Sequence, residues 1–296
     1  MKPTFFILGA AKCGTTSLHD YLSKHPQVCM SDPKEPFFFE AEYEKGFDFY
    51  KSRYFADWQG QPALGDARHR NLYLPYVSGR IRESVPDARL LVVLRNPVDR
   101  AYSHWWHWFS RGRETLAFED AIALDFKRID AGIDFEGADG PDLWTKNFDF
   151  RLGKNEFTTY IDSGYYSRQI ARYAALFPAD QLKVVFLEDL SADQETVVAD
   201  IAGFLGLDPT FRLPPAPARN AANSKIANQL GQVARAVKVS RFLSRGAKDR
   251  LKGLANRFGS TPRLSAATRK DLLSHFRPHN QALQELTGRD LTTWMN

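Results

Sequence analysis

The chain has 296 residues, of which 43% are hydrophobic and 25% are charged, so it can bury an ordinary core and is not expected to be disordered. Its 40 basic and 35 acidic residues give a net charge of +5, which suits an anionic ligand but is too small to indicate nucleic-acid binding. Two cysteines, Cys13 and Cys29, are too few for a disulfide framework and favour a reducing compartment.

We expect neither a signal peptide nor a membrane span. The apolar run at residues 4–8 is shorter than the apolar region of a signal peptide, and a glycine and then a lysine follow it instead of a cleavage site. No stretch approaches the ~18 apolar residues that a membrane-spanning helix needs. The sequence therefore favours a cytoplasmic protein.

Short strand-like runs alternate with helical patterns along the chain, which is typical of a parallel sheet covered by helices. We predict strands over residues 5–8, 89–94 and 182–187, and a weaker one over 63–66. We predict helices over residues 15–24, 73–85, 97–110, 118–130, 167–177 and 192–205. Ser191 and Gln194 match a capping box for the last of these, Pro97 fits the first position of its helix, and Gly288 closes a C-terminal helix.

Two segments interrupt this alternation. Residues 132–157 are rich in Gly, Asp, Asn and aromatic residues, and we interpret them as an inserted loop over an acceptor site. Residues 224–258 have a basic, amphipathic helical pattern with nine Lys or Arg and one acid. This pattern fits a helix that frames an anionic ligand beside the core, or one that lies on an anionic membrane surface. We predict one domain over residues 1–296, a P-loop-type three-layer α/β fold with a central, mostly parallel sheet flanked by helices.

A glycine-containing loop follows the first predicted strand and opens the first predicted helix. It consists of Gly9, Ala10, Ala11, Lys12, Cys13, Gly14, Thr15, Thr16 and Ser17. Such a loop directs backbone N–H groups and a helix N-terminus at an anion. A Walker A loop has its lysine directly after the second glycine, where this chain has Thr15. A nucleotide with a 5′-phosphosulfate has no γ-phosphate and needs no metal bridge, so Lys12 would stabilise the oxygen between phosphate and sulfur.

Residues 5–18 resemble the 5′-phosphosulfate loop of the sulfotransferase family, most closely its heparan-sulfate and Golgi-type branch and bacterial relatives. The second family motif is also present, at residues 94–103 (LRNPVDRAYS). The resemblance implies that Lys12 and residues 13–17 bind the 5′ end of 3′-phosphoadenosine 5′-phosphosulfate (PAPS), and that Arg95 and Ser103 bind its 3′-phosphate. Arg95 ends a predicted strand, where a guanidinium can bind a phosphate through two hydrogen bonds.

Arg257 and Arg263 are the nearest matches to a late basic loop that the family has near the 3′-phosphate and adenine.

The resemblance also implies that Glu35, just before the phenylalanines at residues 37–39, is the general base that takes the acceptor's proton. We expect these phenylalanines to raise its pKa by desolvation. His69 is the alternative base, because it lies just after a predicted strand near the same sheet edge. Relatives have a small residue and a proline where this chain has Arg68, His69 and Arg70, and either arginine is a candidate contact for the donor or an anionic acceptor.

The sequence thus predicts an enzyme that transfers a sulfuryl group from PAPS to a hydroxyl or amine of a glycan, lipid or small molecule, without a metal. A P-loop kinase that uses ATP and Mg²⁺ is the alternative enzyme. A membrane-surface binding protein that uses residues 224–258 is the non-enzymatic alternative. We expect no nucleic-acid partner, and a cytoplasmic location that includes contact with the membrane surface if residues 224–258 bind lipid. The acceptor's identity does not follow from the residues.

Overall fold

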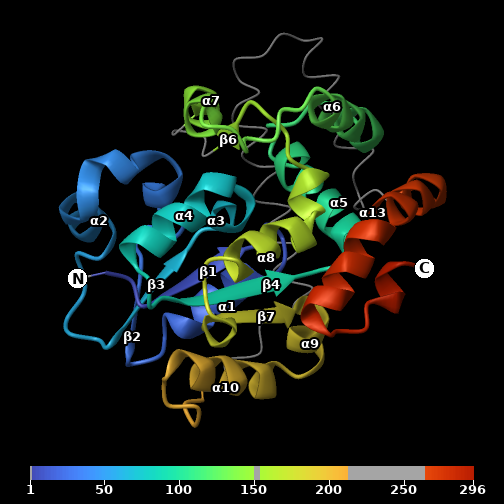
Figure 1. The fold of residues 1–296 in the computed structure, drawn as a ribbon. Coiled ribbons are helices and arrows are strands. Elements are labelled where there is room, and N and C mark those ends of the chain that lie inside the picture. Colours follow the sequence, from blue (N-terminus) through green and yellow to red (C-terminus); the bar gives the residue numbers. More distant parts are fainter. Residues whose placement is uncertain (1, 150–153, 213–263) are drawn as a thin grey trace, which may run out of the picture. The chain divides into compact units, whose positions relative to one another are not determined.

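The structure is a computed structural model that describes residues 2–149, 154–212 and 264–296 (Figure 1). The chain divides into two compact units, one made of Met1–Arg212 with Lys270–Asn296 and the other of Leu213–Arg269. The first unit contains the sheet and the residues of the candidate site. The predicted basic segment at residues 224–258, Arg257 and Arg263 lie outside the described residues.

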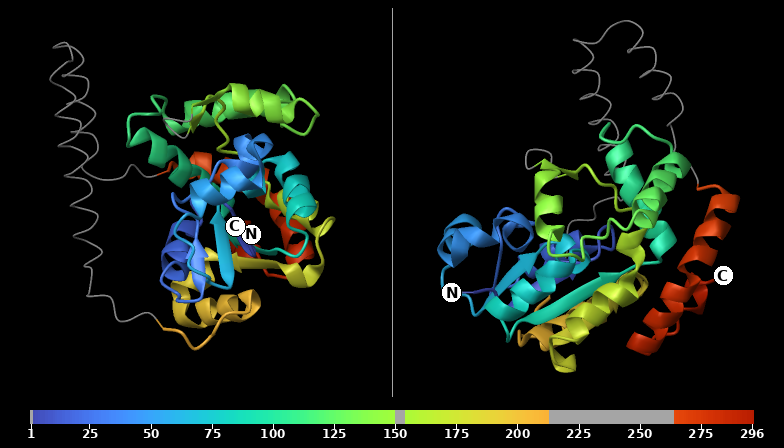
Figure 2. Two further views of the ribbon diagram at one scale, coloured as in Figure 1. Left: turned by 90° about the vertical axis from the view of Figure 1, so that its left-hand side faces the viewer. Right: turned by 45° about the horizontal axis from the view of Figure 1, so that its top comes forward.

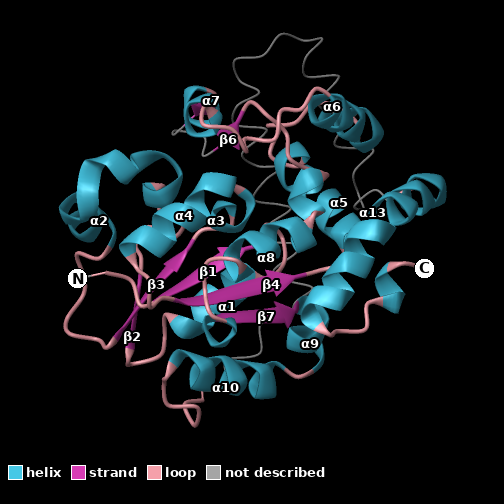
Figure 3. Ribbon diagram, viewed as in Figure 1, coloured by secondary structure: helices cyan, strands magenta, loops and turns pink. Residues whose placement is uncertain are grey.

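A five-stranded sheet, parallel throughout, forms the centre of the first unit (Figure 3). Its strands in sheet order are β2 (Val28–Met30), β3 (Ala63–Ala67), β1 (Phe5–Gly9), β4 (Arg89–Leu94) and β7 (Leu182–Phe186). The inner strands β1 and β4 are almost continuously apolar, because helices cover the sheet on both faces (Figure 2). This arrangement confirms the predicted fold class.

The described helices follow the strands in the order that the alternation predicted. They are α1 (Thr15–Leu22), α2 (Gly46–Tyr54), α3 (Arg70–Tyr73), α4 (Pro75–Ser84), α5 (Pro97–Phe109), α6 (Phe118–Asp130), α7 (Gly140–Lys146), α8 (Tyr166–Ala174), α9 (Leu187–Ala192), α10 (Gln194–Leu205) and α13 (Ala266–Thr287). None of the described helices is long and apolar enough to span a membrane.

The four predicted strands and most of the predicted helices are present, and Gly288 closes α13 with a φ of 68° and an N–H that donates to Gln284 O. The helices predicted over residues 73–85 and 192–205 are present as α4 and α10, and the short helices α3 and α9 directly precede them. Pro75 starts α4 anew after α3, because its ring fits a first helical position. The predicted capping box at Ser191 is wrong: the Ser191 hydroxyl donates to Leu187 O, and the Asp193 side chain caps α10 by accepting from Thr196 N.

The inserted segment is more ordered than a loop. It contains α7 and a small antiparallel pair, β5 (Phe148–Asp149) with β6 (Lys154–Asn155). The prediction of an irregular loop is therefore wrong for these residues, since short elements whose side chains pack against another segment leave little periodicity in the sequence. The strand β2 and helix α2 were not predicted either; β2 is only three residues long.

The described segments of the candidate site follow the carboxyl ends of the strands and therefore lie at one edge of the sheet. The phosphate loop follows β1, Arg68 and His69 follow β3, and Arg95 follows β4. Glu35 lies in the loop after β2. In open α/β sheets this edge is where ligands bind.

Candidate active site

The glycine loop between β1 and α1 is shaped by contacts that leave no room for side chains. Gly14 has a φ of 94°, and a Cβ added there would lie 2.8 Å from Leu187 Cδ1. Gly9 has a φ of 155°, and a Cβ there would lie 2.9 Å from the carbonyl oxygen of His69. Both positions therefore require glycine. The helix α1 begins at Thr15, so the free N–H groups of its first turn point from the loop toward an anion.

Lys12 lies inside this loop on left-handed backbone, with a φ of 66°. Its Nζ is 3.1 Å from Nδ1 of His107, on α5. Burial, followed by the charge of Arg111, lowers the pKa of Lys12, and burial, followed by the charge of Lys12, lowers the pKa of His107 to about 3. His107 is thus neutral, and its Nδ1 accepts a hydrogen bond from the lysine while Nε2 carries the proton. The predicted loop lysine therefore has a partner that the sequence did not identify.

Tyr166, at the start of α8, connects the phosphate loop to the loop after β4. Its hydroxyl lies 3.8 Å from Cys13 Sγ and donates to the carbonyl oxygen of Arg95 at 3.0 Å. Burial raises the pKa of Cys13 to about 11, so the side chain is a thiol, and the Cys13 N–H donates to Ala10 O within the loop at 3.3 Å. Tyr166 was not among the predicted site residues.

Arg95 and Ser103 are half-buried residues at the start of α5 and in its second turn. Asn96 caps this helix by accepting from Val98 N at 3.0 Å, which fixes the direction in which Arg95 leaves β4. Ser103 is four residues before His107 and so shares its helix face. Since His107 contacts Lys12, this face of α5 is turned toward the phosphate loop. Arg95 lies close enough to the loop for its charge to lower the pKa of Lys12, and the helix face that carries Ser103 is turned the same way.

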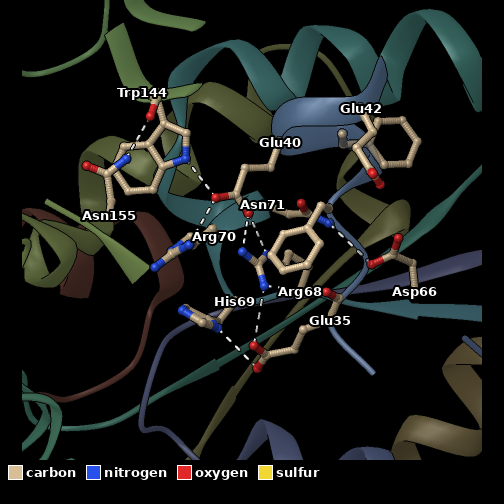
Figure 4. Close-up of polar contacts among 12 residues, drawn as sticks. Glu35, Glu40, Glu42, Asp66, Arg68, His69, Arg70, Asn71, Trp144 and Asn155 are labelled. Carbon is tan, nitrogen blue, oxygen red and sulfur yellow. Dashed lines mark hydrogen bonds and ion pairs between the residues drawn. The ribbon is translucent and has the colours of Figure 1, made fainter. Parts of the chain in front are cut away.

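Glu35 also has left-handed backbone, with a φ of 67°, and its side chain is 33% exposed. One carboxylate oxygen, Oε1, is 3.2 Å from His69 Nδ1 and 3.5 Å from Lys34 Nζ, and Oε2 is 3.4 Å from Arg68 Nη1 (Figure 4). Burial alone would raise the pKa of Glu35, but His69, Arg68 and Lys34 together hold it well below its usual range. The predicted upward shift is wrong, because the sequence did not reveal that these three groups surround the carboxylate.

His69, the alternative base, is therefore bonded directly to Glu35. Burial lowers the pKa of His69, so the neutral ring donates from Nδ1 to the carboxylate. The ring also lines a cavity of about 10 Å³, together with Ala10 and the buried His104. That volume holds about one water molecule. The two candidate bases form a single pair on adjoining loops.

Arg68 and Arg70 are buried, although Arg70 also lines the small cavity beside Ala10 and His69. They are 2% and 8% exposed and both pair with Glu40, a fully buried glutamate that the sequence analysis did not single out (Figure 4). The pairing with Glu40 is a role that the sequence did not suggest for either arginine, and a contact with the donor or an anionic acceptor stays a prediction. Glu40 directly follows the phenylalanines at residues 37–39, which had been interpreted only for their effect on the pKa of Glu35.

The fold and the site together define a three-layer α/β protein with a glycine-containing loop after its first strand. The loop lysine, the arginine after β4 and the carboxylate after β2 lie at the same edge of the sheet. A comparison with protein families identifies the family: residues 2–246 match the model of the sulfotransferase domain, and the chain belongs to this family. The kinase alternative is not favoured.

Individual relatives agree with this assignment. The chain is similar over its full length to a sulfotransferase of known structure from Alicyclobacillus acidocaldarius, with 28% identity, a TM-score of 0.69 and complete coverage of both chains. It is 25% identical to a mouse bifunctional heparan sulfate N-deacetylase/N-sulfotransferase over 99% of this chain and 31% of the relative. It is 23% identical to the membrane-associated sulfotransferase kil1 of Dictyostelium discoideum, over 70% of this chain and 56% of the relative. It thus spans only part of these last two proteins.

Proposed function

We propose that this protein transfers a sulfuryl group from PAPS to a hydroxyl or amine acceptor. The observation that carries the proposal is that a loop lysine and a carboxylate lie near each other at one sheet edge. Lys12 and Glu35 are close enough for the charge of Glu35 to raise the pKa of Lys12 against the effect of burial. One side of the reacting sulfur then has a cation, and the other has a base.

In the proposed reaction the acceptor oxygen or nitrogen attacks sulfur while the bond from sulfur to the bridging oxygen breaks. The bridging oxygen keeps the electron pair, and 3′-phosphoadenosine 5′-phosphate (PAP) leaves. The ammonium of Lys12 stabilises this growing negative charge. Glu35, or His69 bonded to it, accepts the proton that the acceptor loses.

Residues 13–17 bind the 5′ end of the donor through backbone N–H groups and the α1 N-terminus, while Arg95 and Ser103 bind its 3′-phosphate. In this proposal Lys12 does the work that Mg²⁺ does on a triphosphate, so no metal is needed.

Donor binding tests the proposal most directly. Calorimetry should give a dissociation constant for PAP at least about tenfold lower than for ATP with Mg²⁺, because the 3′-phosphate meets Arg95 and no γ-phosphate is needed. The reverse preference would refute the assigned donor. Transfer itself is measured with ³⁵S-labelled PAPS and a panel of acceptors that contains an N-deacetylated heparosan, p-nitrophenol and a sterol. The heparosan is included because relatives are named for heparan sulfate; the panel decides between glycan, small phenol and lipid.

We also propose that the protein acts in the cytoplasm and contacts anionic membrane through residues 224–258. The support is the basic, amphipathic sequence of that segment. Sedimentation with vesicles that contain phosphatidylserine should retain the full chain at low salt and release it at high salt. No difference from neutral vesicles would contradict the membrane contact.

A further inference from the structure

A fully buried carboxylate lies directly behind the candidate base. Glu40 belongs to a single π-helical turn, Phe38–Glu42, and its side chain is inaccessible to solvent. Its Oε2 accepts from Arg68 Nε at 2.6 Å, and its Oε1 accepts from Arg70 Nη1 at 3.0 Å and from Trp144 Nε1 at 2.7 Å. A buried charge without such partners would strongly destabilise the fold. Both carboxylate oxygens of Glu40 are thus committed.

Arg68 uses opposite ends of its guanidinium for two glutamates. Nε and Nη2 contact Glu40, while Nη1 lies 3.4 Å from both Oε2 and the backbone oxygen of Glu35 (Figure 4). The guanidinium also lies over the ring of Phe37, 4.5 Å from its centre, and the side chain is only 3% exposed. A planar group held at this many points has little freedom to rotate. Arg68 therefore fixes Oε2 of Glu35 while His69 fixes Oε1.

We propose that Arg68 is a positioning residue for Glu35, and that Glu40 holds Arg68 in the orientation this requires. The inference rests on the proposed function, in which the Glu35–His69 pair receives the acceptor's proton. Glu35 lies on left-handed backbone between Lys34 and Pro36, and Lys34 is the contact that this turn supplies to the side chain, with Nζ 3.5 Å from Oε1. The remaining exposed surface of Glu35 is free to meet an acceptor.

The charges of the cluster agree with a positioning role. Glu35 and Glu40 are matched by Arg68 and Arg70, so the four residues together carry no net charge. The surroundings of Glu35 contain further groups that influence its ionisation. They are Lys34 on its own loop, Lys12 on the phosphate loop, Asp66 and His69 at the end of β3, and His107 on α5. Arg68 differs from these in being anchored on its far side by a buried acid.

Loss of Arg68 should affect the reaction and leave donor binding intact. In Arg68→Gln the Glu35 carboxylate gains rotational freedom, and we expect kcat to fall about 10- to 100-fold, since small misplacements of a reacting group cost this much. The dissociation constant for PAP should stay within about twofold. The loss of a neighbouring cation should raise the pKa of Glu35, so activity that needs the ionised carboxylate should disappear at a higher pH on acidification.

The experiment combines two readouts on the full chain saturated with PAP. The first is the titration of the Glu35 side-chain carbonyl carbon by NMR in protein labelled with ¹³C-glutamate, assigned by comparison with Glu35→Gln. The second is the pH profile of kcat with whichever acceptor of the panel is sulfated. Arg68→Gln should raise the Glu35 midpoint by at least about one pH unit. Arg68→Lys keeps the positive charge but loses the planar guanidinium that contacts both glutamates. Its Glu35 midpoint should therefore rise less than that of Arg68→Gln, while its kcat should be nearly as low.

Arg80→Gln is the matched control. Arg80 also contacts the π-helical turn, since its Nη1 donates to Phe39 O at 2.9 Å, but it has no contact with Glu35 or with the Glu40 carboxylate. Equal midpoints and equal kcat in Arg68→Gln and Arg80→Gln would overturn the inference. If Arg68→Gln does not fold, Arg68→Lys and Glu40→Gln provide the same comparison. If all variants bind PAP tightly and Arg68→Gln changes neither the Glu35 midpoint nor kcat, the inference alone is rejected. If the unmodified protein does not bind PAP, the proposed function is rejected.

Discussion

Lys12 and Glu35 share a left-handed backbone conformation, with φ values of 66° and 67°, yet the two regions that hold them are built differently. The donor loop, Gly9–Ser17, is shaped by backbone: two glycines tolerate close approach, and the turn directs N–H groups at the ligand. The base cluster, which we define as Glu35, Glu40, Arg68, His69 and Arg70, is shaped by charged side chains. Its two acids and two arginines come from separate segments of the chain.

This difference explains how each region controls ionisation. Lys12 has a neutral partner, His107, and its pKa is lowered chiefly by burial. Glu35 is surrounded by donors and cations, and its pKa falls although burial acts in the opposite direction. A loop that binds through backbone N–H groups can bind any ligand that carries a suitable anionic group. A cluster of paired charges keeps its arrangement only if every member is present. Variants in the two regions should therefore differ in which step they impair.

The largest effect is expected for Lys12→Ala. The substitution removes the only cation that we assign to the bridging oxygen, so kcat should fall about 10²- to 10³-fold, as for the loss of a transition-state hydrogen-bond donor elsewhere. Affinity for PAP, which lacks the sulfuryl group, should fall much less. Steady-state kinetics and calorimetry measure the two quantities separately.

Lys24→Ala, an exposed lysine just beyond α1, is the control and should behave like the unmodified protein. A Lys12→Ala protein with full kcat would show that the donor loop contributes binding alone.

A smaller effect, confined to donor recognition, is expected for Arg95→Ala. Charge-assisted hydrogen bonds to the 3′-phosphate should make PAP bind more tightly than adenosine 5′-phosphate, and their loss should weaken PAP binding about 10- to 100-fold. Affinity for adenosine 5′-phosphate should hardly change. Arg82→Ala, on the exposed side of α4, serves as the control. Equal losses for both nucleotides would place Arg95 away from the 3′-phosphate.

The same difference decides what the sequence predicted. The donor loop follows from local spacing, because strand, glycines and helix start are consecutive in the chain, and the carboxyl-edge rule then brings Arg95 beside it. The contacts within the base cluster cannot be predicted from local spacing, because the partners of Glu40 lie 28, 30 and 104 residues away in the sequence. A buried charged residue looks like a surface residue in a single sequence. Hence Glu35 was identified, but its neighbours and the direction of its pKa shift were missed.

Asp66, at the end of β3, is a buried acid outside the base cluster, and it tests how such an acid changes the free energy of unfolding with pH. Burial raises its pKa to about 7, although Tyr50 donates to Oδ2 at 2.6 Å. The unfolded chain releases this proton near the ordinary aspartate pKa of 3.8, whereas the folded chain keeps it until about pH 7. Stability is therefore lost as pH rises through this window, by at most about 1.4 kcal/mol per pH unit.

Asp66→Asn should remove this dependence. Relative to the unmodified protein, its free energy of unfolding should increase by about 1–2 kcal/mol between pH 5 and pH 7, measured by urea denaturation. Asp180→Asn, at an exposed position, should give no such divergence. Parallel pH curves for Asp66→Asn and the unmodified protein would mean that the buried carboxyl is already ionised at pH 5.

The smallest effect is expected for Trp144→Phe, which asks whether the insert supports the base cluster. Trp144 on α7 is 1% exposed, and its Nε1 donates to Glu40 at 2.7 Å. Phenylalanine keeps an aromatic ring beside Phe135 and Tyr73 but leaves Glu40 with its two arginines as donors. The loss of this hydrogen bond should lower kcat about two- to fivefold, with PAP affinity unchanged. Trp58→Phe, an exposed tryptophan whose Nε1 donates to Gln61 O at 2.9 Å, is the matched control. If the two variants have the same kcat, Arg68 and Arg70 alone suffice to hold Glu40, and the insert has no part in positioning the base.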